Sequence, residues 1–326
     1  ASGQVAAVVS SQTEARMRRR QELTWLGSAV ATTTPRFEEL PKLLPRFEQR
    51  TFGEGDAANK YHDMIVRLPT KDAPAVPVAI VSKRYALVQH TDVVNVLAKS
   101  LQGAGFKPTA LPVRLRMTEY GERMHLSLRL PDHDFDPGDG KPLVLRVNCF
   151  NSVDKSLALE VGLTWERLVC KNGMTVGVKE DGVRQFHVLE SLDSDEVAEF
   201  LRHGLEKVPD DKRTLQVWMT KPVDLPKVEA WADETLMKRW GCLAAARTCH
   251  IARTGFDGGF YPLAQKGLPH NRRIKSRERV PGCRAPITNV YELGQALSWI
   301  ARERQTVQEQ LAMMMEIPGL IEPLLN

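Results

Sequence analysis

The sequence lacks the features that define several large classes of protein. Its 326 residues contain no window of about 18 uncharged apolar residues, so we expect no membrane-spanning helix and no membrane partner. Five cysteines are too few for a disulfide scaffold, and we expect a reducing, cytoplasmic location. The hydrophobic share of 42% and the charged share of 26% exclude a disordered or fibrous chain. A folded globular protein remains.

The short motifs that mark common enzyme and cofactor sites are also missing. No GxxxxGK[ST] or GxGxxG segment is present to hold phosphates, and neither HExxH nor GxSxG occurs. Cys242 and Cys249 are separated by six residues, with His250 beside them, and this spacing favours buried thiols over metal ligands. We therefore predict no metal ion, no cofactor and no catalytic residue. A binding protein is favoured over an enzyme, and catalysis stays an open question.

Charge is small overall but unevenly placed. The chain has 45 basic and 40 acidic residues, a net charge of +5, which does not identify a partner. Residues 180–234 hold fourteen acidic against seven basic side chains, whereas residues 265–284 hold seven basic side chains against Glu278 alone. An acidic region followed by a basic loop predicts a polarised molecule.

The sequence pattern predicts an α+β fold in three parts. Residues 1–60 are rich in small, polar, Pro and Gly residues and predict an N-terminal extended arm. Residues 61–190 predict a core with a central antiparallel sheet backed by helices, and residues 191–326 predict a mainly helical C-terminal region with the basic loop 265–284.

The strongest local pattern is a strict alternation of apolar and polar residues. It covers residues 113–118 and 124–130, on either side of a turn at 119–122, and predicts an antiparallel hairpin. Similar runs at 143–149 and 157–161 predict a third and a fourth strand, with a loop at 131–142.

This alternation places several polar side chains on one face of neighbouring strands. They are Arg114, Arg116, His125, Ser127, Arg129, Arg146 and Asn148. Four arginines on one sheet face are suited to a phosphate backbone, because each guanidinium is a charged, forked donor. The alternative is an ordinary solvated sheet face.

The basic loop adds a second candidate element for phosphate contact. Its proposed nucleic-acid-binding residues are Arg272, Arg273, Lys275, Arg277 and Arg279. Closely spaced bases in a flexible loop are typical of nucleic-acid contacts. The alternative is a loop that is merely exposed to solvent.

Three segments together are similar to a known family. The first is Arg-Tyr-Ala-Leu-Val at 84–88, followed by a helix and Gly-Phe-Lys-Pro at 105–108. The second joins Phe-Asn-Ser-Val-Asp-Lys-Ser at 150–156 and Arg-Leu-Val-Cys-Lys-Asn-Gly at 167–173. The third is Arg-Gln-Phe-His at 184–187, with a late Ile-Thr-Asn at 287–289. Over residues 78–305 the chain resembles the phage/plasmid-like family called domain of unknown function 932, found in prophages and on conjugative plasmids. The family usually has Asn-Ser-His-Asp-Gly-Ser, so Val153 and Lys155 depart from it. The matching residues are Asn151, Ser152, Asp154, Ser156, Arg167, Cys170, Asn172, Arg184 and His187, of which Asn151, Ser152, Asp154, Arg167, Asn172, Arg184 and His187 form the candidate polar site.

The resemblance implies a mobile-element protein in DNA maintenance, recombination or defence evasion. The order of helix, hairpin and further strands is also similar to single-strand annealing proteins of the Rad52/RecT kind, which implies a DNA-binding oligomer. For the shared motif two interpretations stay open. Asn151, Ser152 and Asp154 can close a turn through their own backbone bonds, or Asn151 and Asp154 can converge with Arg184 and His187 on a ligand.

The leading hypothesis is therefore a mobile-element protein that binds and anneals single-stranded DNA as a homo-oligomer. The alternative is a counter-defence or regulatory factor that binds a host protein through the acidic region 180–234. A third hypothesis is an enzyme that uses Asn151, Asp154 and His187.

Overall fold

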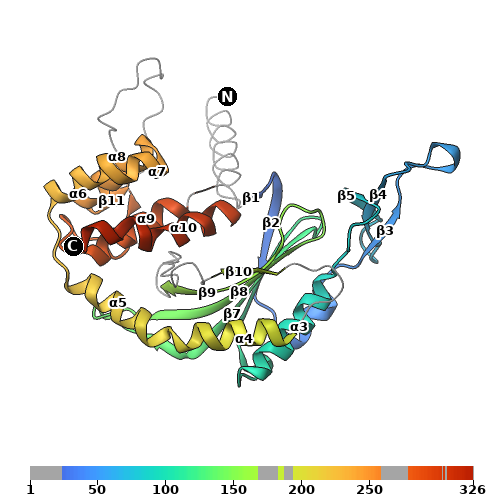
Figure 1. Cartoon of the computed structure of the whole chain (residues 1–326), viewed down its shortest axis with the longest axis horizontal. Helices are drawn as coiled ribbons and strands as arrows, with labels where there is room; N and C mark the ends of the chain where they lie inside the picture. Colours follow the sequence, from blue (N-terminus) through green and yellow to red (C-terminus); the bar gives the residue numbers. More distant parts are fainter. Residues whose placement is uncertain are drawn as a thin grey trace, which may run out of the picture.

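A seven-stranded antiparallel sheet forms the centre of the computed structural model, which describes residues 24–167, 183–186, 194–257, 278–302, 304 and 307–325 (Figure 1). The strand order is β1-β2-β6-β7-β8-β9-β10. The strands are β1 (Thr24–Trp25), β2 (Ser28–Thr33), β6 (Val113–Thr118), β7 (Arg123–Phe135), β8 (Leu143–Ser152), β9 (Leu159–Arg167) and β10 (Val183–Phe186). The sheet thus joins the N-terminal part of the chain to the predicted hairpin.

The hairpin of β6 and β7 lies where the alternation predicted it, with Arg116 opposite His125. The loop predicted at 131–142 is wrong in its first part, because β7 continues to Phe135. The register shifts after Leu130, and Phe135 then pairs with Leu143 of β8. Phe135 also packs edge-on against Trp165, with ring centroids 6.2 Å apart. This apolar contact keeps the strand extended where the local sequence resembles a loop.

Three helices cover the apolar face of this sheet (Figure 1). They are α3 (His90–Gly103), α4 (Ser194–Glu206) and α5 (Val208–Thr220). Val93, Leu97 and Leu101 of α3 are buried in one cluster with the leucines of β7 and β8. Burial of that apolar surface stabilises the layer at about 25 cal/mol per Å². The helices therefore leave the opposite, polar face of the sheet to other contacts.

The C-terminal part is mainly helical and shares the same core. Its elements are α6 (Leu225–Trp231), a π-helical turn η4 (Ala232–Leu236), α7 (Met237–Trp240), α8 (Cys242–Thr254), β11 (Phe256–Asp257), β12 (Glu278–Arg279), α9 (Val290–Arg302), α10 (Val307–Ile321) and η5 (Glu322–Leu324). Helix α9 packs against α5 and α8, and α10 contacts β1. A single buried cluster runs from Leu40 to Leu324, so this part is continuous with the sheet. Among the helices described, none is long and apolar enough to cross a membrane.

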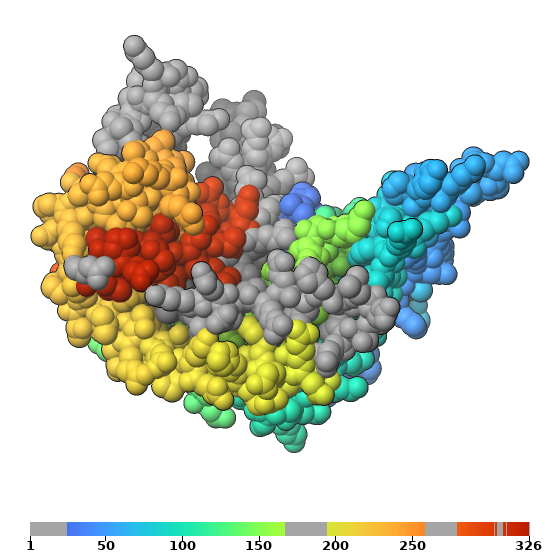
Figure 2. Space-filling view, viewed as in Figure 1, coloured from blue at the N-terminus to red at the C-terminus, as the bar shows by residue number. Residues whose placement is uncertain are grey.

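A second, three-stranded sheet projects from the body of the molecule (Figure 2). It consists of β3 (Phe47–Thr51), β4 (His62–Arg67) and β5 (Val76–Ser82) in that order. The short elements before it are η1 (Phe37–Glu39) and α2 (Leu40–Leu43). Two further short turns are η2 (Gly55–Ala57), between β3 and β4, and η3 (Pro108–Ala110), between α3 and β6. The described part of the predicted arm, residues 24–60, contributes strands to both sheets. Strand β2 pairs with β6 of the larger sheet, and β3 pairs with β4 of the smaller one. The α+β fold class is confirmed.

Candidate functional site

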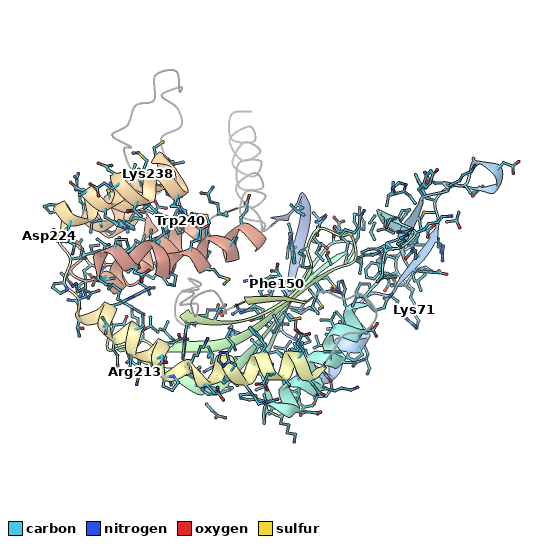
Figure 3. The ribbon with its side chains drawn as sticks, viewed as in Figure 1. Lys71, Phe150, Arg213, Asp224, Lys238 and Trp240 are labelled. Carbon is cyan, nitrogen blue, oxygen red and sulfur yellow. The ribbon has the colours of Figure 1, made fainter. Side chains whose placement is uncertain are left out.

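The predicted polar side chains share one face of the seven-stranded sheet. Arg114 lies opposite Ser127, which lies opposite Asn148 on the next strand. Arg129 lies opposite Arg146 in the same way. Because side chains alternate along a strand, this register places all seven predicted residues on the face that α3, α4 and α5 do not cover. Phe150, labelled in Figure 3, belongs to this polar face, and Arg213 of α5 lies on the far side.

This polar face is not an ordinary solvated surface. His125, Ser127, Arg146 and Asn148 are all less than a tenth exposed. Arg114, Arg116 and Arg129 are partly buried. Charged groups in such a setting need partners, because the loss of hydration is costly.

One carboxylate serves two of the arginines. Arg114 Nη1 donates to both carboxylate oxygens of Glu166, at 2.9 and 3.1 Å, and Arg146 forms an ion pair with the same carboxylate. Arg116 lies beside them, and its buried Nε atom has no hydrogen-bond partner among the residues that the structure describes. Burial, and then the charge of Arg114, lower the pKa of Arg116. The cluster of Arg114, Arg116 and Arg146 with Glu166, here called the basic cluster, therefore holds an excess of positive charge.

A neutral histidine borders the basic cluster. His125 stacks on Phe150 with ring centroids 4.2 Å apart and planes 4° apart. Burial, followed by the charge of Arg116, lowers the pKa of His125 to about 3. The neutral ring donates from Nε2 to Asn148 Oδ1 at 2.8 Å, and Asn148 Nδ2 donates to Thr164 Oγ1 at 2.7 Å. This chain of hydrogen bonds crosses three strands and holds the ring flat against Phe150.

Of the other proposed nucleic-acid-binding residues, the structure describes Arg129, beside Arg146, and Arg279, in the C-terminal part. Arg129 is paired with Asp134 on its own strand. Arg279 is exposed in β12, which pairs with β11 in the C-terminal part. Arg272, Arg273, Lys275 and Arg277 lie outside the described residues. Within the described ranges, no three His, Cys, Asp or Glu side chains are grouped to hold a metal ion.

Asn151 and Ser152 lie on opposite faces at the end of β8, and Asp154 lies in the connection that follows. Asn151 points toward α3, where its Nδ2 lies 2.9 Å from His90 Nδ1. Ser152 Oγ donates to the carbonyl oxygen of Leu157 at 3.0 Å, and Asp154 Oδ1 accepts from the backbone N–H of Ser156 at 3.0 Å. These bonds close the connection between β8 and β9, as in the turn interpretation. Arg167 and Arg184 lie in β9 and β10, whereas Asn172 and His187 fall outside the described residues.

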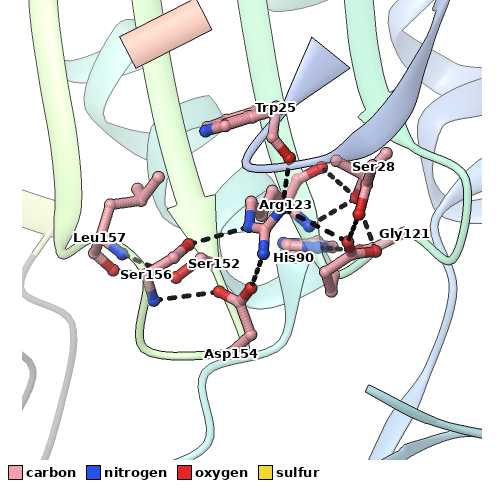
Figure 4. Close-up of polar contacts among 11 residues, drawn as sticks. Trp25, Ser28, His90, Gly121, Arg123, Ser152, Asp154, Ser156 and Leu157 are labelled. Atoms are coloured by element: carbon pink, nitrogen blue, oxygen red, sulfur yellow. Dashed lines mark hydrogen bonds and ion pairs between the residues drawn. The ribbon is translucent and has the colours of Figure 1, made fainter. Parts of the chain in front are cut away.

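Sequence reasoning missed the residue at the centre of this connection, Arg123 (Figure 4). Its Nη2 pairs with Asp154 Oδ2 at 2.5 Å, and its Nη1 donates to the carbonyl oxygen of Trp25 at 2.5 Å. Its Nε donates to Ser156 Oγ at 3.0 Å. Arg123 follows the same period of two as His125, and that period is the one signal that could have included it. Its role here is to join β1, β7 and the β8–β9 connection.

A cavity of about 380 Å³ opens beside the basic cluster. Arg114 and Arg146 contribute to its wall, together with Arg36 from the segment between β2 and η1. The other lining residues come from the segments before η1 and around η3: Thr34, Pro35, Phe37, Thr109, Ala110, Leu111, Pro112 and Val113. Three arginines thus line a partly apolar space.

Fold and site together define an α+β protein whose sheet carries a partly buried basic face. The sequence model of the family "Domain of unknown function (DUF932)" matches residues 77–256, more than half of the chain, and the protein belongs to that family. Comparisons with curated proteins and with solved structures found no match.

Proposed function

We propose that the chain binds single-stranded nucleic acid along the polar face of the seven-stranded sheet, as a protein of a mobile genetic element. The observation that supports this is the basic cluster, in which Glu166 pairs with Arg114 and Arg146 while the guanidinium of Arg116 lies beside them. A phosphate oxygen offers the charge and the acceptor that this cluster lacks. Each phosphate that binds also releases counterions, which adds to affinity at low salt.

A single strand suits this face better than a duplex. The side chains of Arg114 and Arg146 are 27% and 9% exposed, so they are recessed below the surface. A flexible single strand can bring one phosphate at a time to recessed arginines, whereas the stiff backbone of a duplex cannot follow the same path. Annealing and self-association extend this proposal and are measured on the same sample.

The test is the binding of fluorescently labelled single-stranded and duplex DNA across a salt series, followed by fluorescence anisotropy. We expect single strands to bind more tightly than duplex, with an affinity that falls steeply as salt rises. Mass photometry of the same sample measures the oligomer. Absence of binding at low salt would overturn the proposal and direct the search to a host protein that binds the acidic region.

Arg116→Gln is the most informative variant. Its buried Nε has no hydrogen-bond partner among the described residues, and the substitution removes repulsion from Arg114 and Arg146, so the fold should be kept. We expect the slope of log affinity against log salt to become shallower by about 0.7 for each phosphate that the variant no longer neutralises. Arg213→Gln is the matched control, because Arg213 is 73% exposed on α5 and pairs with the neighbouring Asp210. Equal affinities for the two variants would contradict the role of the basic cluster.

A further inference from the structure

We infer that the cavity beside the basic cluster binds a nucleoside that carries a terminal phosphate monoester. The inference rests on the proposed function, because the same excess of positive charge would select this ligand. The free nucleotide and the phosphorylated end of a strand share this chemistry.

The cavity is built by segments that the fold holds together. Residues 34–37 lead from β2 into η1, and residues 109–113 lead from η3 into β6. The turns η1 and η3 contact each other, and β2 pairs with β6. The two walls are therefore fixed to the same strands that position Arg114, so the cavity is formed before a ligand arrives.

The charge of the lining favours a doubly charged group. Its charged side chains are Arg36, Arg114 and Arg146, and no Asp or Glu is among the described lining residues. Glu166 is shared by Arg114 and Arg146, and Glu39 pairs with Arg36 from outside the lining. A phosphate monoester carries a charge of about −1.5 to −2 at neutral pH, against −1 for the diester inside a strand. Two carboxylates shared among three guanidinium groups leave a net positive charge, which attracts a terminal phosphate, with its larger charge, more strongly than an internal diester.

The remaining lining favours a ring attached to that phosphate. Pro35, Phe37 and Leu111 present apolar surface, and Thr34 and Thr109 supply hydroxyl groups that can donate or accept. A volume of about 380 Å³ lies within the range of about 300–1,000 Å³ that small-molecule sites occupy. Inorganic phosphate would leave most of this space empty, whereas a nucleoside fills it with a flat ring against the apolar wall.

The first experiment measures the binding of small ligands to the full chain by isothermal titration calorimetry. The probes are thymidine monophosphate, thymidine and inorganic phosphate. We expect the monophosphate to bind at least about tenfold more tightly than either part alone, because it uses both the guanidinium groups and the apolar wall. Equal affinities for the monophosphate and inorganic phosphate would overturn the inference.

Two variants place the binding in the cavity. Arg36→Gln removes a cavity cation that is 80% exposed, so it should not disturb folding. Its matched control is Arg50→Gln on β3, which is also exposed and paired with a nearby glutamate. Ala110→Trp fills the cavity from an exposed position without changing any charge. We expect Arg36→Gln and Ala110→Trp each to weaken binding of the monophosphate about tenfold or more, and Arg50→Gln to leave it unchanged. Unchanged binding in both cavity variants would contradict the site.

The source of the phosphate is decided with oligonucleotides. We compare a strand that carries a 5′-phosphate with the same strand that carries a 5′-hydroxyl. If the phosphorylated strand binds more tightly and Ala110→Trp abolishes this difference, the ligand is a strand end. Binding of the free monophosphate without this difference identifies a free nucleotide. If the monophosphate fails to bind while strands bind in an Arg116-dependent manner, the inference fails and the proposed function stands. If the monophosphate binds and strands do not, the proposed function fails and the cavity is a nucleotide site.

Discussion

The guanidinium of Arg123 and the carboxylate of Asp154 form an ion pair, with Nη2 and Oδ2 2.5 Å apart, that ties strand β7 to the connection between β8 and β9. The two side chains are only 11% and 7% exposed. Removal of one partner from such a pair leaves a buried charge poorly compensated.

Asp154→Ala should therefore destabilise the protein by about 3–5 kcal/mol, measured as the free energy of unfolding in urea. Glu229→Ala is the control, because it breaks an ion pair with Arg253 whose side chains are 38% and 57% exposed. That exposed pair should contribute less than about 1 kcal/mol. Similar small effects in both variants would show that Glu122, whose Oε1 lies 3.5 Å from Arg123 Nη1, compensates the guanidinium.

Gly121 is required for two independent reasons at the turn between β6 and β7. Its φ angle is +74°, and an added Cβ would lie 2.5 Å from Pro45 Cγ. Gly140 has a φ angle of +73° with no atom within 4 Å of the added Cβ. We expect Gly140→Ala to cost about 1 kcal/mol through backbone strain and Gly121→Ala about 1–3 kcal/mol more through the clash with Pro45. Equal destabilisation in urea unfolding would show that Pro45 moves aside.

Stability should fall as the medium becomes acidic, in part because of His90. Burial lowers the pKa of His90 to about 4, and its neutral ring donates from Nε2 to the carbonyl oxygen of Gly121 at 2.7 Å. The unfolded chain binds a proton at a pKa of about 6.5, so the unfolded state is favoured as pH falls from about 6.5 towards 4. His125 acts in the same direction, since its pKa is about 3.

The variant His90→Gln tests this pH dependence. It should lower the free energy of unfolding at neutral pH, because a buried side chain is replaced, and should reduce the slope of stability against pH below about 6.5. His203→Gln, on an exposed histidine of α4, is the control for loss of a histidine at a solvent-exposed position. The measurement is urea unfolding at several pH values, and an unaltered slope in His90→Gln would contradict the buried neutral histidine.

Asp211 gives the stability of the protein the opposite dependence on pH. Burial raises its pKa to about 6, although Trp165 Nε1 donates to its Oδ2 at 3.1 Å. The folded state thus disfavours the ionised form, and stability decreases as pH rises from about 4 through about 6. Asp211→Asn should stabilise the protein by about 1–2 kcal/mol above pH 7, measured by urea unfolding, and this gain should vanish near pH 4. Asp210→Asn should give a smaller part of the gain, because the charge of Asp210 contributes to raising the pKa of Asp211.

The polar face of the sheet could be predicted because it depends on local sequence. A period of two is a property of neighbouring residues, so the alternation around Arg114 and His125 determined which side chains share a face. The extent of burial could not be predicted, because it depends on segments distant in the chain. The hydrogen bond from Arg123 to Trp25, for example, joins residues 98 positions apart.

Other parts of the site had no local signal. Residues 28–33 are small, mostly Ala and Thr, and were expected in an arm; their pairing with β6 shows that they form a strand. The cavity depends on this pairing, because Arg36 closely follows the strand. Glu166, the partner of Arg114 and Arg146, lies beyond the predicted end of its strand at residue 161, so the shared carboxylate was not expected.

The pairing of β2 with β6 also bears on how the protein can be divided. The segment that the family model matches begins at residue 77, after β1, β2, β3 and β4. A fragment cut at that position would expose the backbone donors and acceptors of β6 along a bare sheet edge, a template for aggregation. It would also leave β5 without its neighbour and the cavity without one wall. The unit that folds is therefore larger than the segment that the family model matches.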